Sequence, residues 1–354
     1  MTASFWKGKR VFVTGHTGFK GSWLGAILKI LGAEVSGYAL KPAQDFKLFE
    51  VVRSAGGFGS VEADIRNIDL LIKEMQKRQP EVVFHLAAQP IVTEGYNNPV
   101  YTYEVNVMGT VNVLEAVRCC GSVRSFINVT TDKVYQNNEW VWGYRENDIL
   151  DGYDPYANSK SCSELATNAY KRSFLCDVAV SICRAGNVIG GGDYGANRII
   201  PDCVRAAMQN TEITIRNPGA IRPYQHVLDP LFAYLLVAHS QWEKPIAYQG
   251  TYNIGPDIND CVTTAKLADL FCEAWGGGLR WKHAVQDNAP HEANLLMLDC
   301  SKIKKNLKWH PVWRIDQAVN KTVQWWQEYL AGCSMFPVME KQINEYLSEA
   351  AYEI

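Results

Sequence analysis

Arg10-Val11-Phe12-Val13-Thr14-Gly15-His16-Thr17-Gly18-Phe19-Lys20-Gly21 is the stretch that decides the fold. Residues 10–14 are a short apolar run that predicts a strand, and a helical pattern follows the last glycine through Leu31. Small residues at such a turn let backbone N–H groups approach a pyrophosphate at the positive end of the helix dipole. The spacing Gly-x-x-Gly-x-x-Gly departs from the usual Gly-x-Gly-x-x-Gly and is weak evidence alone, but its place directly after the first strand predicts a dinucleotide site.

Further apolar runs alternate with helical segments after this turn. The runs that predict strands are residues 35–38, 61–63, 82–88, 126–129 and 178–183. Helical patterns cover residues 68–79, 99–119 and 156–174. Strands and helices that alternate in this way form a parallel sheet with helices on both faces. The predicted fold class is therefore α/β, with a doubly wound parallel (Rossmann) sheet.

The pattern changes after the glycine-rich residues 186–192. Short segments embedded in loops follow, and two amphipathic helices, whose tryptophans we assign to the core, close the chain. The short segments are residues 197–201, 213–215, 222–227 and 252–255. This arrangement predicts a smaller C-terminal substrate lobe over the crevice of the sheet. We assign residues 1–186 to a dinucleotide-binding domain, to which residues 223–252 return, and residues 187–222 and 253–354 to the substrate lobe.

Residues that follow the first four predicted strands are expected to hold the dinucleotide. Where an acidic residue normally binds the ribose of NAD, this sequence has Tyr38, with Lys41 nearby, so the residues alone leave NAD and NADP open. Asp64 is placed to meet the adenine, and the small side chains after His85 suit close approach of a ribose, with core packing as the alternative. The expected cofactor-binding residues are Gly15, Thr17, Gly18, Phe19, Lys20, Tyr38, Asp64, Ile65, Leu86, Ala87, Ala88, Tyr156 and Lys160.

Chemistry is expected where the fifth predicted strand ends, because the carboxyl ends of parallel strands face the crevice of the sheet. A hydroxyl, a carboxylate and an amine stand side by side there, in Thr131, Asp132 and Lys133. Tyr156 and Lys160 follow, one helical turn apart on one face. With 17 tyrosines in the chain this pair has little weight alone, but together with a dinucleotide turn it is specific. A phenol has a pKa near ~10, so it acts as a base at neutral pH only beside positive charge, here from Lys160 and oxidised nicotinamide.

The glycine turn, Thr131, Tyr156 and Lys160 resemble the extended short-chain dehydrogenase/reductase superfamily, whose members include nucleotide-sugar epimerases and dehydratases. Longer segments resemble the dehydratases of this superfamily that act on CDP-glucose. These segments are Trp6-x-Gly8-Lys9-Arg10, residues 14–24, residues 131–135, His291-Glu292-Ala293 and Leu298-Asp299-Cys300-Ser301-Lys302. The resemblance covers most of the chain. It implies NAD as the cofactor and CDP-glucose as the substrate, which is converted to CDP-4-dehydro-6-deoxyglucose.

The resemblance also implies a role for each catalytic residue. Tyr156 would take the proton of the sugar 4-hydroxyl, with which Thr131 forms a hydrogen bond, while hydride leaves C4 for NAD. The 4-ketone then acidifies C5, water is lost across C5 and C6 with Asp132 as general acid, and hydride returns to C6. NAD is not consumed in this cycle.

Lys133 departs from the pattern of relatives that act on dTDP- or GDP-sugars, which carry a glutamate there as the base for C5. A lysine serves as that base only when it is neutral, which requires desolvation or neighbouring cations. Lys160 would favour the neutral form of Lys133, and Asp132 would oppose it. Two hypotheses stay open: Lys133 is the base, or it stays charged and stabilises the enolate while Tyr135 or water takes the proton.

Substrate binding is assigned to Asn187, Arg198 and Arg222, as donors to the pyrophosphate. Arg222 stands in Arg-Pro-Tyr-Gln-His-Val, which resembles the phosphate-contacting segment of the superfamily. Two other functions stay open. A nucleotide-sugar 4-epimerase would need the tyrosine and lysine pair but neither the general acid nor a base at C5. A non-enzymatic protein that senses NAD(P) typically lacks an intact tyrosine and lysine pair.

Composition limits the partners and the location of the protein. A net charge of −2 over 354 residues, without a long run of Lys or Arg, gives no attraction to nucleic acid or to anionic membranes. A signal segment and an apolar stretch of ~18 residues are both missing, so a cytoplasmic protein is expected. The 10 cysteines lack a Cys-x-x-Cys pair and the histidines lack metal-like spacing, so we expect reduced core cysteines, structural histidines and no metal. Faces of the helices 99–119 and 156–174 resemble a four-helix interface of the superfamily, which implies a homodimer or homotetramer.

Overall fold

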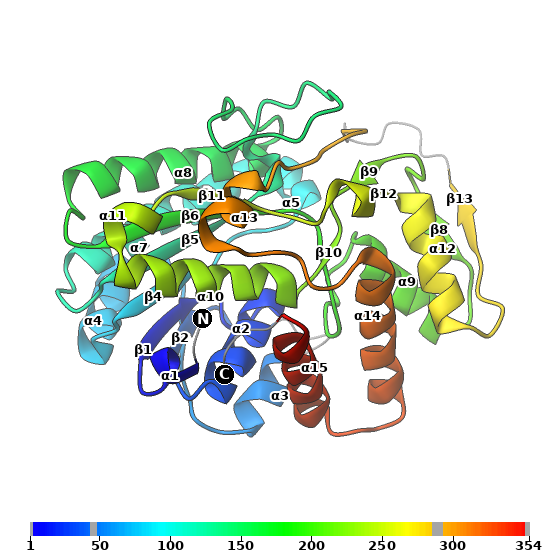
Figure 1. Ribbon diagram of the computed structural model, residues 1–354, viewed down its shortest axis with the longest axis horizontal. Coiled ribbons are helices and arrows are strands. Elements are labelled where there is room, and N and C mark those ends of the chain that lie inside the picture. Colours follow the sequence, from blue (N-terminus) through cyan, green and yellow to red (C-terminus); the bar gives the residue numbers. More distant parts are fainter. Residues whose placement is uncertain (1–2, 43–47, 285–292, 351–354) are drawn as a thin grey trace.

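The computed structural model describes residues 3–42, 48–284 and 293–350. Within these residues, seven parallel strands form one sheet in the order β11-β6-β5-β4-β1-β2-β3 (Figure 1). The strands are β1 (Arg10–Thr14), β2 (Glu34–Ala39), β3 (Phe58–Glu62), β4 (Val82–His85), β5 (Ser125–Thr131), β6 (Ala179–Ala185) and β11 (Thr251–Ile254). The order of the strands reverses between β1 and β4, and ligands of doubly wound sheets bind at such a switch point. The predicted fold class is confirmed.

Helices cover both faces of the sheet, as the alternation of side chains along its strands requires. On β1, Val11 and Val13 belong to one hydrophobic cluster and Phe12 belongs to the other. One face carries α2 (Phe19–Ile30) and α10 (Leu228–Glu243), and the other carries α4 (Ile68–Arg78), α7 (Gly109–Arg118) and α8 (Pro155–Ser173). Because both faces are buried, the strands are near-continuous apolar runs, which is why the sequence predicts them.

The strands that carry the site differ in length from the prediction. β5 continues to Thr131, because Thr130 and Thr131 pair with Arg184 and Ala185 of β6. Polar side chains interrupt the apolar pattern of these strands without interrupting the backbone ladder. β4 ends at His85, and residues 86–88 leave the sheet as a loop.

Three other segments also differ from the prediction. β3 covers residues 58–62 rather than 61–63, because pairing with β2 holds Gly59 and Ser60 in the ladder despite their low strand propensity. Residues 252–255, expected in the lobe, contribute to β11 at the edge of the main sheet, beside β6. Residues 197–201 lead into a helix, α9 (Ile199–Met208), whose first turn accommodates a proline.

The long helix predicted over residues 99–119 contains a π-helical turn. It consists of α6 (Pro99–Tyr103), the π-helix Glu104–Met108 and α7. Within the π-helical turn, the Asn106 side chain accepts a hydrogen bond from Gln89 N at 2.8 Å and donates to Ser159 Oγ of α8 at 2.9 Å. A π turn often marks a functional site. Here it brings Asn106 next to the helix that carries Tyr156 and Lys160.

The lobe is built from short strand pairs and helices. Its pairs are β8 (Ile213–Ile215) with β13 (Trp281–His283), β9 (Ile221–Arg222) with β12 (Val262–Thr263), and β10 (Gln225–His226) with β7 (Val188–Ile189). Its helices are α9, α12 (Thr264–Trp275) and α14 (Ile315–Leu330), whereas α13 (Ser301–Leu307) packs against β11 and α10. The last helix, α15 (Met335–Glu349), packs against α2 and α3 (Leu48–Ser54) of the first domain. Figure 1 shows the body of the lobe to the right of the sheet.

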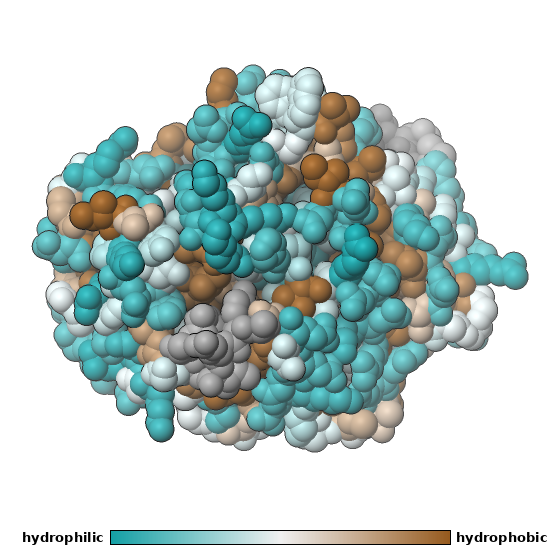
Figure 2. All heavy atoms as spheres, viewed as in Figure 1, coloured by the Kyte–Doolittle hydropathy of each residue, from teal (hydrophilic) through white to brown (hydrophobic). Residues whose placement is uncertain are grey.

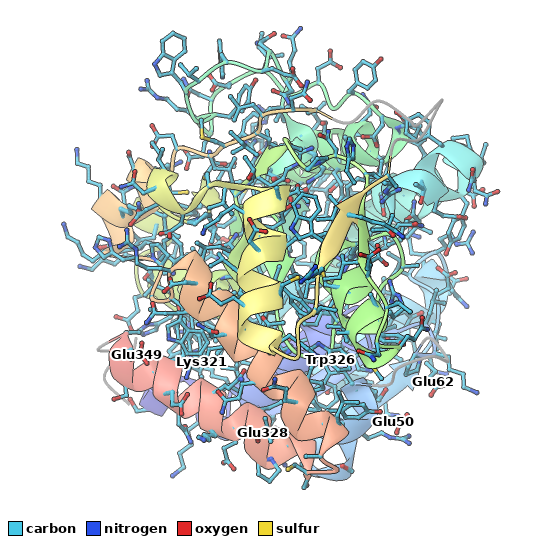
Figure 3. The ribbon with its side chains drawn as sticks, turned by 90° about the vertical axis from the view of Figure 1, so that its right-hand side faces the viewer. Glu50, Glu62, Lys321, Trp326, Glu328 and Glu349 are labelled. Atoms are coloured by element: carbon cyan, nitrogen blue, oxygen red, sulfur yellow. The ribbon has the colours of Figure 1, made fainter. Side chains whose placement is uncertain are left out.

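Buried tryptophans and an ion pair hold the two closing helices in place. Trp325 and Trp326 of α14 are fully buried, which confirms that the tryptophans of these helices belong to the core. Figure 3 shows α14 and α15 side by side, with Lys321 and Trp326 on the first and Glu349 on the second. Lys321 Nζ donates to Glu345 Oε2 of α15 at 2.5 Å.

The surface is mixed in character. Figure 2 shows mainly hydrophilic side chains on one face, with apolar residues in small groups. Among the described residues, none of the helices is long and apolar enough to cross a membrane. All 10 cysteines lie in the described part of the chain and are unpaired. The expectation that they are core residues is correct only for Cys120, Cys183, Cys203 and Cys300, which are buried.

Candidate active site

A deep cavity lies between the carboxyl ends of the central strands and the lobe. Its volume is about 1560 Å³. The glycine turn after β1, the loop after β4, the end of β5, the start of α8 and residues of the lobe form its wall. Pockets for one small ligand measure roughly 300–1,000 Å³, so this cavity has room for two ligands side by side.

Close packing explains two glycines of the turn. Gly15 has φ +75°, and a Cβ there would lie 2.7 Å from Ala87 N. A Cβ on Gly21 would lie 2.2 Å from Gly15 O. Real Cβ atoms do not approach backbone so closely, so both positions need glycine for the turn to pass between β4 and α2.

Gly18 is different, because protein packing does not require a glycine there. A Cβ would meet only Gly15 O, at 3.4 Å, and φ is −78°. Gly18 is the exposed N-cap of α2 at the cavity wall, and among the described residues no side chain caps this helix. The first N–H groups of a helix lack intrahelical acceptors and attract anions. A phosphate-bearing ligand that approaches the backbone closely accounts for both features.

The other predicted cofactor residues divide into two groups. Thr17, Phe19, Lys20, Asp64, Ile65, Leu86, Ala87 and Ala88 line the cavity. Tyr38 does not line it, which corrects the expectation that its side chain meets a ribose: it is fully buried, and its hydroxyl donates to Asp64 O at 3.0 Å. Burial opposes ionisation of Asp64, but hydrogen bonds from Arg66 outweigh it and lower the pKa of this carboxyl. Asp64 therefore offers a carboxylate acceptor at the adenine end.

The histidines of the first domain have structural roles, as expected. His16 is buried, lies 2.7 Å from Ser60 Oγ through Nε2 and stacks on Phe58. A Cβ on Gly37 would lie 2.2 Å from the His16 ring, so the strand beneath it needs glycine. Burial lowers the pKa of His16 to about 4, which keeps it neutral. The expected segment His291-Glu292 lies outside the described residues.

The residues predicted at the end of β5 are in contact with one another. Thr131 is the last residue of the strand, and Asp132 begins a 3-10 turn, η2 (Asp132–Val134). Asp132 Oδ1 accepts hydrogen bonds from Thr131 Oγ at 2.9 Å and from Lys133 Nζ at 2.9 Å. Lys133 Nζ also donates to Asn187 Oδ1 at 3.2 Å. Thr131 and Lys133 line the cavity, whereas the Asp132 side chain is fully buried behind them.

The Asp132 carboxylate is left incompletely satisfied. Its Oδ2 has no hydrogen-bond partner among the described residues. A buried oxygen without a partner is costly and is found where a proton or a ligand is exchanged.

Tyr156 and Lys160 project from the first turns of α8. Asp154 caps this helix by accepting from Ala157 N at 3.0 Å, and a proline occupies its first position. A Cβ on Gly95 of α5 (Val92–Asn97) would lie 3.1 Å from Tyr156 N, so this glycine lets the two helices pack closely. Lys160 Nζ donates to Val129 O of β5 at 3.1 Å. Both side chains line the same cavity as Thr131.

Burial dominates the electrostatics of this pair. It raises the pKa of Tyr156 to about 12, although a hydrogen bond with Thr131 and the charge of Arg198 act in the opposite direction. Burial lowers the pKa of Lys160 to about 8. A tyrosine base needs a cation nearby, and Lys160 is such a cation only below about pH 8.

A further lysine lies beside the catalytic groups. Lys20, predicted as a cofactor residue on the glycine turn, is close enough to Arg198, Asp132 and Lys160 to interact with their charges. Burial, together with Arg198, lowers its pKa to about 7. The sequence places Lys20 on the turn but gives no signal that it stands among these charges.

The predicted substrate residues all line the cavity. Asn187 accepts from Lys133, as described. Arg198 is half-exposed and forms an ion pair with Asp193 at 3.2 Å. Arg222 is buried, and its guanidinium donates to the backbone carbonyls of Ile221, at 2.9 Å, and Ala293. Arg216 and Asn217, which follow β8, also line the cavity at its lobe end, and no motif in the sequence predicts them there.

Tyr135, one of the alternatives for the C5 base, is engaged elsewhere. Its hydroxyl donates to Asn253 Oδ1 at 2.6 Å and accepts from Arg184 at 2.6 Å. Burial raises its pKa far above the ordinary value. Tyr135 also lines the cavity, but its hydroxyl is held by Asn253 and Arg184, which makes it a poor base for a substrate proton.

Comparisons with known proteins agree with this arrangement. The family described as GDP-mannose 4,6 dehydratase matches residues 12–322. The CDP-glucose 4,6-dehydratase of Salmonella typhimurium is 44% identical over 352 residues, which cover 98% of this chain and 98% of that protein. The structure of UDP-glucose 4-epimerase from Thermotoga maritima with UDP-glucose has a TM-score of 0.80 at 25% identity, and the match covers 90% of this chain and 99% of that one. The dTDP-glucose 4,6-dehydratase of Bacillus anthracis in complex with NAD has a TM-score of 0.78 at 22% identity, covering 93% and 100%, and shows the common fold.

Proposed function

The chain belongs to the GDP-mannose 4,6-dehydratase family, and on that premise we propose that it is an NAD-dependent CDP-glucose 4,6-dehydratase. The substrate is taken from the name of the Salmonella relative, which matches nearly the whole chain. One observation carries the proposal: Thr131, Lys133 and Tyr156 converge on a single cavity whose wall also contains the glycine turn. The size of this cavity suits a dinucleotide together with a nucleotide sugar.

The cofactor fits the end of the cavity beside β1. Gly18 and the uncapped start of α2 suit its pyrophosphate, and the Asp64 carboxylate suits its adenine. NAD bound there supplies a hydride acceptor for C4 of the sugar and a hydride donor for C6. Tyr38 contributes through its bond to Asp64 O rather than by touching a ribose.

Tyr156 is proposed as the base for the 4-hydroxyl. Its phenolate needs compensation, which Lys160 provides as long as it is protonated. Thr131 lies beside the tyrosine and forms a hydrogen bond with it. These residues remove the hydroxyl proton and hold the oxygen while a ketone forms.

Asp132 and Lys133 are proposed to carry out the loss of water. The hydrogen bond of 2.9 Å between them lets one proton move from the ammonium to the carboxylate. This single transfer produces a neutral amine, the proposed base for C5, and a neutral acid, the proposed proton source for the departing 6-hydroxyl, whose proton must cross from behind the cavity wall. The pair has no net charge before or after the transfer, so the exchange needs no proton from solvent.

Incubation of the purified protein with CDP-glucose and NAD tests the proposal. The expected product is a 4-ketone that has lost one water, seen by mass spectrometry and by the alkaline absorbance of the ketone. UDP-, dTDP- and GDP-glucose in parallel reactions measure the preference for cytidine. A product of unchanged mass, with only C4 inverted, would identify a 4-epimerase instead. No turnover of any sugar, with NAD still bound, would favour a cofactor-sensing protein.

We propose that the protein is a cytoplasmic homodimer or homotetramer. Large apolar side chains are exposed on neighbouring helices of the first domain, namely Val100, Met108, Leu165 and Phe174. Val100 lies on α6, Met108 on the π-helix, Leu165 on α8 and Phe174 directly after it, and exposed apolar side chains on such helices suit a four-helix contact. Light scattering of Leu165→Glu is expected to show a monomer, whereas Leu330→Glu, at another exposed leucine on α14, is expected to leave the assembly unchanged. Fractionation of the expressing cells tests the location.

A further inference from the structure

Behind the catalytic residues lies a fully buried ion pair. Glu164 follows Lys160 by one turn on α8, so Tyr156, Lys160 and Glu164 share one face of the helix. Glu164 Oε1 accepts from Arg184 Nε at 2.9 Å, and Oε2 accepts from Arg184 NH2 at 2.5 Å. The side chains are 0% and 3% exposed.

The pair connects the elements that carry the site. Thr130 Oγ of β5 donates to Glu164 Oε1 at 2.6 Å, directly beside Thr131. Arg184 comes from β6, and its NH1 donates to the Tyr135 hydroxyl at 2.6 Å and to Glu146 O at 3.1 Å. Through these bonds, α8, β5, β6 and the segment after the Asp132–Lys133 turn are fixed relative to one another.

Such a pair is not explained by stability alone. Removing two charges from water costs several kcal/mol per ion. Apolar residues of the same volume often give equal or greater folding stability at such positions. The position of the pair is informative, because its negative member lies one turn from a lysine that must stay charged. The positive member lies on the far side of the carboxylate, bonded to β6 and to the loop at Tyr135.

We propose that Glu164 is a positioning residue for the reaction: its carboxylate keeps Lys160 in the charged form that Tyr156 requires and ties the end of β5 to α8. The inference rests on the proposed function of this site. Arg184 supports this role of Glu164, because its guanidinium holds the carboxylate in place and donates hydrogen bonds to both carboxylate oxygens.

The other groups around Lys160 do not provide this charge. His85 of β4 is buried and neutral, and Lys20 of α2 opposes protonation of Lys160 while it is protonated itself, so neither supplies a negative charge. Tyr156 on the same helix is neutral until it has lost its proton. Burial lowers the pKa of Lys160, and Glu164 is the group that raises it. Two charges one helical turn apart, at an effective dielectric constant of about 20, change a pKa by about one to two pH units.

The test compares Glu164→Gln with the double variant Glu164→Gln/Arg184→Gln. The single variant removes the negative charge and leaves a buried guanidinium, whereas the double variant removes both charges. Ser181→Ala is the matched control, since it removes a buried hydrogen bond to Gln241 from the same strand, β6, without changing a charge. The alkaline limb of the kcat profile is measured with CDP-glucose. The pKa of Lys160 is measured without cofactor by NMR of labelled lysine, assigned with Lys160→Met.

Activity depends on protonated Lys160, so it is lost as pH rises through the pKa of this lysine. In Glu164→Gln the limb is expected to move down by about one to two pH units. The alkaline limb and the Lys160 pKa of the double variant are expected to lie between those of the single variant and the wild type. Those of the control are expected to match the wild type. kcat is expected to fall more than the KM for CDP-glucose rises.

Two results would overturn the inference. One is an unmoved alkaline limb and Lys160 titration in Glu164→Gln together with reduced thermal stability, which means that the pair is purely structural. The other is a double variant whose alkaline limb and Lys160 titration match the wild type, which means that a neutral glutamine serves as well as the carboxylate. If Glu164→Gln does not fold, a Lys160 pKa below the wild-type value in the double variant supports the inference, and an equal value refutes it. A wild type inactive on CDP-glucose refutes the proposed function instead, and the lysine titration still tests the coupling.

Discussion

Replacing Lys133 separates the two hypotheses for the loss of the C5 proton. Lys133→Gln removes the amine but keeps an amide that can donate to Asp132. If Lys133 is the base, kcat is expected to fall roughly 10²- to 10⁴-fold, which corresponds to about 3–5 kcal/mol in the activation barrier. The side chain is 30% exposed, so the cost in folding stability is expected to be only about 1 kcal/mol.

Lys133→Arg is the matched control, because guanidinium keeps the charge and the bond to Asp132 but does not give up its proton. A base role predicts that both variants lose dehydration. A role in stabilising the enolate predicts that the arginine variant keeps most of it. Because the Tyr135 hydroxyl is bound by Asn253 and Arg184, water is the remaining alternative base.

The assay follows each step separately. Absorbance of the reduced nicotinamide in a single turnover reports oxidation at C4, which both variants are expected to retain. Incubation in D₂O with mass spectrometry reports exchange at C5. Exchange at the wild-type rate in Lys133→Gln would refute the base assignment and, with it, the proton transfer proposed within the Asp132–Lys133 pair.

Three further outcomes are expected. Gly18→Val is expected to weaken NAD binding about tenfold or more, equivalent to about 1.4 kcal/mol. The melting temperature is expected to stay the same, because protein atoms leave room for the new Cβ. Unchanged NAD affinity in calorimetry would contradict this prediction. Arg198→Met is expected to raise the KM for CDP-glucose roughly 10- to 100-fold through loss of charged hydrogen bonds worth about 1.5–3 kcal/mol, and an unchanged KM would remove it from the substrate site. Burial and Arg198 lower the pKa of Lys20 to about 7, and a bound pyrophosphate raises it. NAD binding at about pH 8 is therefore expected to take up protons, and at about pH 5 to take up none from this group, as calorimetry in buffers of different ionisation enthalpy measures.

The sequence predicts the sheet and its helices because both faces of the sheet are buried. Apolar runs then coincide with strands, and breaks coincide with loops. The prediction is wrong at β5 and β6, where Thr130 and Arg184 are polar and yet remain in the ladder. It is also wrong for residues 252–255, because a short segment does not reveal whether it pairs within the lobe or with β6.

Some residues of the site could be predicted from the sequence and others could not. Residues close in sequence, such as Asp132 and Lys133, could be assigned because the strand end fixes their position. Tyr38 was misplaced, since spacing from the glycine turn gives its place along the strand and not the face on which its side chain lies. The contact between Glu164 and Arg184 joins residues that are adjacent only after folding, and neither belongs to a recognisable motif.

The proton balance of the proposed cycle explains why Thr131 stands where it does. The substrate gives up protons from the 4-hydroxyl and from C5, and receives one in the departing water and one at C5. Tyr156 therefore ends the cycle with one proton too many and Asp132 with one too few, whereas Lys133 takes a proton from C5 and returns it. Thr131 lies close enough to Tyr156 to affect its pKa, and its Oγ donates to Asp132 Oδ1 at 2.9 Å. A proton that passes from the tyrosine to this hydroxyl, as the hydroxyl proton passes to the carboxylate, restores both groups without solvent. The residue proposed to orient the 4-hydroxyl would thus also connect the oxidation step to the dehydration step.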